Sequence, residues 1–239
     1  MRTGFAISSF CLNDLPLEMA LDRLSAVTDY VEVMDEGCHR LEDTAVLETF
    51  DLRYAIHAPS RGVNLASLLE PVRRASVEVT VACLALAVEV DAPVVVHPGY
   101  FAWPRDRKKA EQQFARSLAD LLEAAGDLSA TFFMENMGDW EHFLLKTPDE
   151  LPLIDGAGFA LDVGHAHQNH VLPAFLEVPI SHFHLHDNDG TTDSHSAVGD
   201  GTIDFSAVMA AVRRSNVRPV IEVGTFEGVM QSIAALESL

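Results

Sequence analysis

The sequence predicts a single (β/α)₈ barrel, a TIM barrel of the α/β class that forms one domain over residues 1–239. Eight short runs with the composition of β-strands recur along the chain, and stretches with helical periodicity separate them. No Gly/Ser-rich or Pro-rich linker interrupts this alternation. Because strands that alternate with helices form parallel sheets with right-handed crossovers, eight such units close most naturally into a barrel.

The expected strands are short and apolar, and many of them end next to polar residues. They are Thr3–Ser8, Tyr30–Met34, Arg53–His57, Pro93–His97, Ala130–Glu135, Gly158–Asp162, Ile180–His186 and Arg218–Glu222. The clearest helices are expected at Leu15–Val27, Asp43–Phe50, Leu68–Ala87, Asp106–Ala125, Phe205–Arg214 and Phe226–Leu239, and segments 140–155 and 166–177 are only weakly helical. A doubly wound open sheet is the alternative. It is disfavoured because no GxGxxG phosphate loop follows the first strand.

Charge and cysteine content restrict the partners and the cellular compartment. The chain has 16 basic and 36 acidic residues, a formal charge of −20, so it lacks the basic surface that binds a phosphate backbone. Nucleic acid is therefore a disfavoured partner. The three cysteines, Cys11, Cys38 and Cys83, have no paired spacing and are expected to be reduced, buried thiols. Together with the lack of a signal or membrane segment, this predicts a soluble cytoplasmic protein.

Residue types that ligate metals stand at the ends of six consecutive expected strands. The active site of a (β/α)₈ barrel forms at the carboxyl ends of its strands, where these side chains would meet. Imidazoles and carboxylates in one desolvated space need a cation, and zinc, manganese and iron use such donors. The sequence therefore predicts a divalent-metal site, with zinc or manganese as the metal, among His57, His97, Glu135, Asp162, His165, His184 and Glu222.

The seventh expected strand carries three histidines, His182, His184 and His186, whose side chains share one face because they are two residues apart. We expect His184 to be the ligand and His186 to contact either a ligand residue or the substrate. Asp193 and His195 follow, one residue apart, and they could hold a metal together with His165. The alternative is a polar surface turn.

Taken together, these residues resemble the xylose-isomerase-like barrel superfamily, which includes sugar-phosphate isomerases and epimerases and the endonuclease IV type of apurinic endonuclease. In the endonuclease branch this resemblance implies three zinc ions: one on His57, His97 and Glu135, a second on Glu135, Asp162, His184 and Glu222, and a third on His165, Asp193 and His195. The sequence departs from the endonuclease pattern at His186, where that pattern has Asn, and at Ser194, where it has a basic residue.

The resemblance implies a metal-dependent isomerase or epimerase for a sugar, a sugar phosphate or a related hydroxy-carbonyl compound, with one to three divalent ions. Glu135 and Glu222 would act as acid and base, and His186 would assist catalysis or hold the substrate. Glu32 and Arg61 are expected substrate contacts, although Glu32 could instead be a buried carboxylate paired with an arginine. A zinc phosphodiesterase like endonuclease IV and a metal-stabilised binding barrel without activity are the alternatives. Pairing into a homo-oligomer is compatible with such a barrel.

Overall fold

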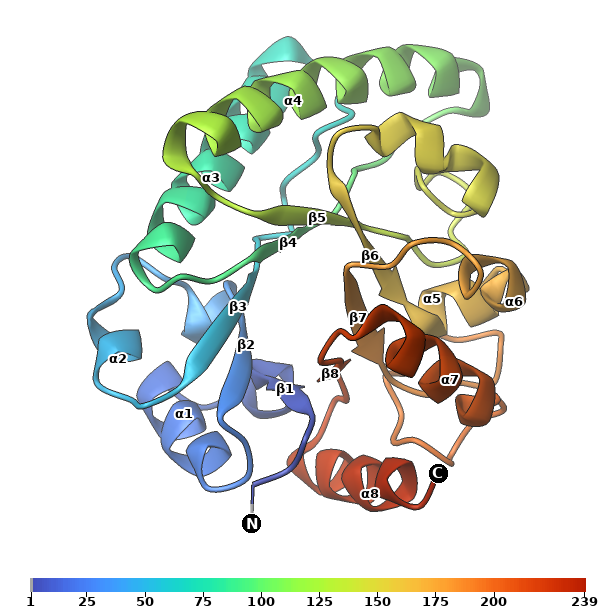
Figure 1. Cartoon of the computed structure of the whole chain (residues 1–239). Coiled ribbons are helices and arrows are strands. Elements are labelled where there is room, and N and C mark those ends of the chain that lie inside the picture. The colour runs from blue at the N-terminus through green and yellow to red at the C-terminus, as the bar shows by residue number, and fades with distance from the viewer. Residues whose placement is uncertain (1) are drawn as a thin grey trace.

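The computed structural model describes residues 2–239 as a closed barrel in which eight parallel strands pair in sequence order, from β1 to β8 and back to β1 (Figure 1). The strands are β1 (Ala6–Ser8), β2 (Tyr30–Met34), β3 (Arg53–His57), β4 (Val94–Val96), β5 (Phe132–Glu135), β6 (Gly158–Asp162), β7 (His182–Leu185) and β8 (Val220–Ile221). The predicted fold class is therefore confirmed.

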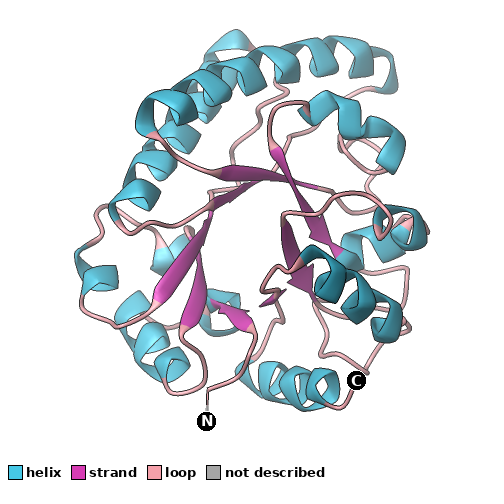
Figure 2. Cartoon of the chain, in the orientation of Figure 1, coloured by secondary structure: helices cyan, strands magenta, loops and turns pink. Residues whose placement is uncertain are grey.

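The helices form a ring outside the strands, and the two longest, α3 and α4, lie side by side (Figures 1 and 2). The α-helices are α1 (Leu17–Ser25), α2 (Ala45–Glu48), α3 (Glu70–Glu89), α4 (Arg107–Leu128), α5 (Val163–Gln168), α6 (Leu172–Phe175), α7 (Phe205–Ser215) and α8 (Phe226–Glu237). Four 3₁₀ helices accompany them: η1 (Ser9–Leu12), η2 (Gly37–His39), η3 (Pro104–Asp106) and η4 (Pro148–Ile154). The weak segment 140–155 is helical only in η4, and segment 166–177 divides between α5 and α6.

Several expected strands are longer than the strands that form. The first expected strand begins at Thr3, but the Thr3 amide donates to the Val27 carbonyl in a loop, and pairing with β8 starts only at Ala6. At the other rim the seventh strand ends at Leu185, since Asp187 bridges to Ser196 in the loop that follows. Some apolar flanking residues, such as Phe5 and Ile180, are buried although they lie outside the strands, because the adjoining loops also pack on the core. Burial therefore extends beyond the hydrogen-bonded strand pairs.

The loop after β7 is folded over the mouth of the barrel by a buried carboxylate. Asp187 accepts hydrogen bonds from the backbone amides of Gly199, Gly201 and Ile203. Gly201 must be glycine, because a Cβ there would lie 2.3 Å from the Asn188 carbonyl oxygen. This internal bonding holds the segment between Asn188 and Gly199 in place over the strand ends.

The cysteines and the helices test two further expectations. Cys11 and Cys83 are buried free thiols, as predicted, but Cys38 is exposed because η2 carries it in a loop outside the barrel. The prediction of a core position was wrong for Cys38.

Among residues 2–239, no helix combines the length and the apolar character that crossing a bilayer requires.

Candidate metal centre

A cavity of about 1340 Å³ opens at the carboxyl ends of the strands. Seven of the predicted ligands line it: His57, His97, Glu135, His165, Asp193, His195 and Glu222. The other two, Asp162 and His184, are fully buried beneath it. The structure thus brings together all nine residues that the sequence singled out.

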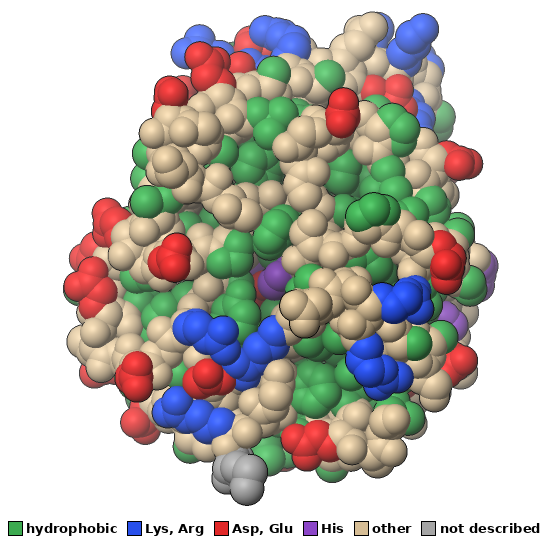
Figure 3. Space-filling view, in the orientation of Figure 1, with side chains coloured by type: hydrophobic (Ala, Val, Ile, Leu, Met, Phe, Trp, Pro, Cys, Tyr) green, Lys and Arg blue, Asp and Glu red, His purple; other side chains and the backbone are tan. Residues whose placement is uncertain are grey.

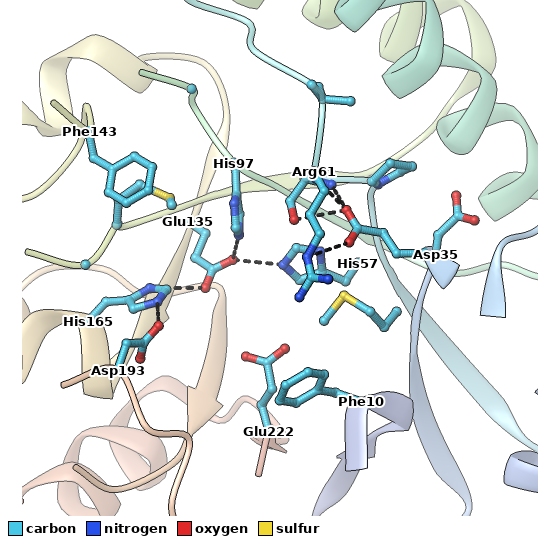
Figure 4. Close-up of a pocket in the computed structure, with 18 of the residues that line it drawn as sticks. Phe10, Asp35, His57, Arg61, His97, Glu135, Phe143, His165, Asp193 and Glu222 are labelled. Atoms are coloured by element: carbon cyan, nitrogen blue, oxygen red, sulfur yellow. Dashed lines mark hydrogen bonds and ion pairs between the residues drawn. The ribbon is translucent and has the colours of Figure 1, made fainter. Parts of the chain in front are cut away.

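Glu135, the last residue of β5, lies at the centre of this cluster (Figure 4). Its Oε2 atom is 3.2 Å from His57 Nε2 and 3.0 Å from His97 Nε2. Its Oε1 atom is 3.2 Å from His184 Nδ1 and 3.6 Å from His165 Nδ1. The two oxygens of one carboxylate therefore face two different groups of histidines, which is the arrangement that a bridging ligand requires.

A second group of donors joins two glutamates that line the cavity to two residues buried beneath it. His184 Nδ1 is 3.3 Å from Glu222 Oε2 and 3.9 Å from Asp162 Oδ2. One ligand atom from each of Glu135, Asp162, His184 and Glu222 lies within 4.8 Å of all the others. Three carboxylates and one imidazole at this spacing, all at most 4% exposed, form a donor set that suits a divalent cation.

The third group lies at the edge of the cavity. Asp193 Oδ2 is 3.1 Å from His165 Nε2 and 3.4 Å from His195 Nε2. The loop that Asp187 folds over the mouth carries both Asp193 and His195. The alternative of a polar surface turn does not describe this placement, since Asp193 points inward at His165.

The ring orientations of three histidines fit metal binding. The Nδ1 atoms of His57, His165 and His195 lie 2.9 Å from the carbonyl oxygens of Ala58, Asn136 and Glu222. A carbonyl can only accept, so each Nδ1 carries the proton and donates it. In the neutral ring this leaves the lone pair on Nε2, which is the atom that faces the carboxylates. The residues present therefore fit a divalent metal.

In the metal-free protein, protonated histidines compensate the negative charge of the carboxylates. Burial lowers the pKa of His57, but Glu135, Glu222 and Glu32 together raise that pKa to about 9. Burial likewise lowers the pKa of His195, but Asp193, Glu222 and Asp162 together raise it to about 9. Burial raises the pKa of Glu135, but His184 and His97 hold it well below its usual range. The carboxylates are therefore ionised and require a cation, either a proton on a histidine or a metal ion.

The other predicted site residues lie in different surroundings. His186 does not reach the cavity: it is fully buried, and its Nε2 atom is 3.0 Å and 3.1 Å from the two carboxylate oxygens of Asp162. Glu32 is also fully buried and contacts two histidines instead of an arginine or the cavity. Arg61 does line the cavity, with its side chain 87% exposed and its Nε atom 3.6 Å from Glu36 Oε2.

Sequence reasoning did not find the aromatic wall of the cavity, which consists of Phe10, Tyr100, Trp140 and Phe143. The ring centroids of Tyr100 and Trp140 are 5.5 Å apart, and those of Trp140 and Phe143 are 4.9 Å apart. Phe10 lies in η1, Tyr100 in the loop after β4, and Trp140 and Phe143 in the loop after β5. Their spacing along the chain does not show that all four line one cavity.

The fold and this donor set define a (β/α)₈ barrel with a candidate multinuclear metal centre at the carboxyl ends of its strands. A profile of the xylose isomerase-like TIM barrel family matches residues 26–239, so the chain belongs to that family.

Several relatives resemble the chain over most of its length. The uncharacterized protein MJ1614 of Methanocaldococcus jannaschii is 32% identical over 231 residues, which cover 93% of this chain and 92% of the relative. The probable endonuclease 4 of Mycobacterium tuberculosis is 28% identical over 213 residues, 82% of each chain. The structural neighbours include a D-tagatose 3-epimerase-like protein, with a TM-score of 0.89, 26% identity and coverage of 100% of this chain and 96% of that one. The TTHB071 protein of Thermus thermophilus, soaked with ZnCl₂, has a TM-score of 0.75, 25% identity and coverage of 100% and 97%.

Proposed function

We propose that the protein is a divalent-metal-dependent isomerase or epimerase that acts on a sugar or a related hydroxy-carbonyl compound. The observation that carries the proposal is the group Glu135, Asp162, His184 and Glu222, in which two glutamates border the substrate-sized cavity and the other two donors lie beneath. The likeness to the D-tagatose 3-epimerase-like protein supports the same reaction class.

A divalent zinc or manganese ion held by this group would supply a Lewis acid, which withdraws electrons from a sugar carbonyl and so acidifies the neighbouring C–H bond. Glu135 comes from β5 and Glu222 follows β8, so the two carboxylates approach the cavity from different strands. One takes a proton from the substrate carbon and the other returns it. Both are almost fully buried, which keeps bulk water away from the exchanging proton.

The charges around the cavity favour an uncharged substrate. Among the described residues that line it, Arg40 and Arg61 are the two arginines, and each contacts a carboxylate, Arg40 on Asp35 and Arg61 on Glu36. Neither arginine is left as an uncompensated partner for a phosphate. The aromatic wall suits the apolar C–H faces of a sugar ring. We therefore propose an unphosphorylated sugar, with Arg61 as a contact to an outer hydroxyl group.

Solvent-deuterium incorporation tests this proposal. Zinc- or manganese-loaded protein in D₂O, supplied with a panel of ketohexoses and the corresponding phosphates, should exchange a carbon-bound hydrogen of at least one unphosphorylated sugar. Glu135→Gln should abolish the exchange, whereas Glu141→Gln, an exposed carboxylate in the loop after β5, should leave it unchanged. Exchange confined to phosphorylated sugars would contradict the substrate class, and no exchange in the panel would contradict the reaction.

A zinc phosphodiesterase is the second candidate, and the third donor group favours it. Proton transfer requires one metal ion, whereas His165, Asp193 and His195 add a further cluster of the kind that phosphoester hydrolysis uses. The relatives called probable endonuclease 4 agree with this candidate. The charge of −20 opposes it, and on the face that Figure 3 shows, the basic side chains lie in separate groups. Cleavage of an abasic duplex that disappears in Glu135→Gln would establish the phosphodiesterase.

A further inference from the structure

A buried group of three polar side chains, Glu32, His182 and His184, lies next to the candidate metal centre, and one ligand atom from each lies within 4.8 Å of the others. Glu32 on β2 is 2.8 Å from His182 Nε2 through Oε2 and 2.9 Å from His184 Nε2 through Oε1. Glu32, His182 and His184 are 0%, 2% and 0% exposed. No substrate in the cavity could reach Glu32, because His184 stands between it and the donors that line the cavity floor.

His184 has one ring nitrogen on each side of its ring. Nδ1 faces the metal centre, 3.2 Å from Glu135 Oε1 and 3.3 Å from Glu222 Oε2, whereas Nε2 faces Glu32. This orientation is the reverse of that of His57, His165 and His195, whose Nδ1 atoms lie on backbone carbonyls. A neutral imidazole has one N–H group and one lone pair. His184 can therefore offer a lone pair to a metal only if its proton is on Nε2, beside Glu32.

We infer that Glu32 is a positioning residue: it accepts the Nε2 proton of His184 and thereby fixes Nδ1 of His184 as the atom that ligates the metal. The inference rests on the metal-binding part of the proposed function and is independent of which reaction the protein catalyses. A carboxylate in this role also raises the basicity of the ligating ring, which strengthens metal binding.

His182 completes the arrangement by holding Glu32 in place. It occupies the second oxygen of Glu32, and its ring stacks on Phe133 at 5.7 Å and lies edge-on to His184 at 5.1 Å. Glu32 Oε1 and His184 Nε2 are in contact at 2.9 Å, but within the described part of the chain neither atom has a hydrogen bond of good geometry, to the other or to any other group. Each of these two buried atoms therefore depends on the other for compensation.

Metal affinity of the folded protein tests the inference. In Glu32→Gln the side chain keeps its shape but loses its charge, so zinc binding, measured against a competing chelator, should weaken by about 10- to 100-fold. The visible spectrum of the Co²⁺-loaded variant should also differ from that of the wild-type protein. Asp35→Asn is the matched control, because it removes the charge of a fully buried carboxylate just after β2 that lines the cavity and contacts Arg40 but belongs to none of the donor groups. Asp35→Asn should leave both the zinc affinity and the Co²⁺ spectrum unchanged.

A measurement on the wild-type protein keeps the inference testable if Glu32→Gln does not fold. In the ¹⁵N spectrum of histidine-labelled, zinc-loaded protein, His184 should show a metal-bound Nδ1 and a protonated Nε2. A metal-bound Nε2, or a Glu32→Gln variant with wild-type affinity and spectrum, would overturn the inference while leaving the proposed function intact. If the wild-type protein binds no divalent metal, both the inference and the proposed function are wrong.

Discussion

Replacing Gly164 by alanine inserts a methyl group into the support of the metal centre. Gly164 is in α5, two residues after Asp162, and a Cβ there would lie 2.0 Å from His186 Cε1 and 2.5 Å from His186 Nε2. His186 is fully buried and cannot retreat without leaving the Asp162 carboxylate, to which its Nε2 atom bonds at 3.0 Å. The change should therefore disturb packing and the orientation of a candidate ligand together.

The magnitude follows from those two effects. Overpacking of a tight interior costs about 1–3 kcal/mol, and loss of a buried hydrogen bond to a charged group costs about 1.5–3 kcal/mol. We therefore expect Gly164→Ala to lower the free energy of unfolding by about 3–5 kcal/mol. For a chain of this length that is a fall in Tm of roughly 6–20 °C.

Thermal unfolding and zinc competition measure the two effects on the same samples. Gly126→Ala is the matched control: no atom lies within 4 Å of a Cβ built at this position in α4, so alanine should stabilise the protein by up to about 1 kcal/mol. If Gly164→Ala unfolds within about 2 °C of the wild-type Tm, which corresponds to at most about 1 kcal/mol, and binds zinc normally, His186 does not hold Asp162 as we describe.

Three further outcomes are expected. The pKa values of His57 and His195 rise from 6.5 to about 9 in the metal-free protein, so the stability that their protonated forms contribute is complete below pH 6.5 and is lost as the pH rises through 9. The Tm of the metal-free protein should therefore fall over this range. The zinc affinity measured by calorimetry should increase over the same range, because zinc no longer competes with protons. A metal-free Tm that rises over the same range would contradict these assignments. His195→Asn should remove only the ion of the third group, and His97→Asn only that of the first, as metal analysis would show; loss of all the metal from either variant would mean that the groups are not separate sites. Gly201→Ala should destabilise the loop after β7 by about 1–3 kcal/mol and weaken the third group, and an unchanged Tm and metal content would argue against its tight packing.

The donor set could be read from the sequence because a parallel barrel places the carboxyl end of every strand at one rim. His57, Glu135 and Asp162 each close a strand, so recognising the strand was sufficient to place the side chain. The loop residues Asp193 and His195 had no such support. Their placement depends on Asp187, which binds amides 12 to 16 residues further along the chain.

Depth and partners across the barrel could not be predicted. The two-residue period shows that His182, His184 and His186 point to the same side, but it does not show which of them joins the metal centre or that none of them lines the cavity. Glu32 and His182 are 150 residues apart and meet only because β2 and β7 face each other through the barrel interior. The sequence leaves a substrate contact or an arginine as the partner of Glu32, since local sequence contains no information about contacts between strands that are not neighbours in the barrel.

Metal analysis of purified protein, dialysed against zinc or manganese and then against metal-free buffer, tests the central claim most directly. The wild-type chain should retain at least one divalent ion per molecule. Glu135→Gln should retain fewer ions, because Glu135 faces both the first and the second donor groups. A correctly folded wild-type protein that retains no zinc or manganese after this treatment would contradict the account.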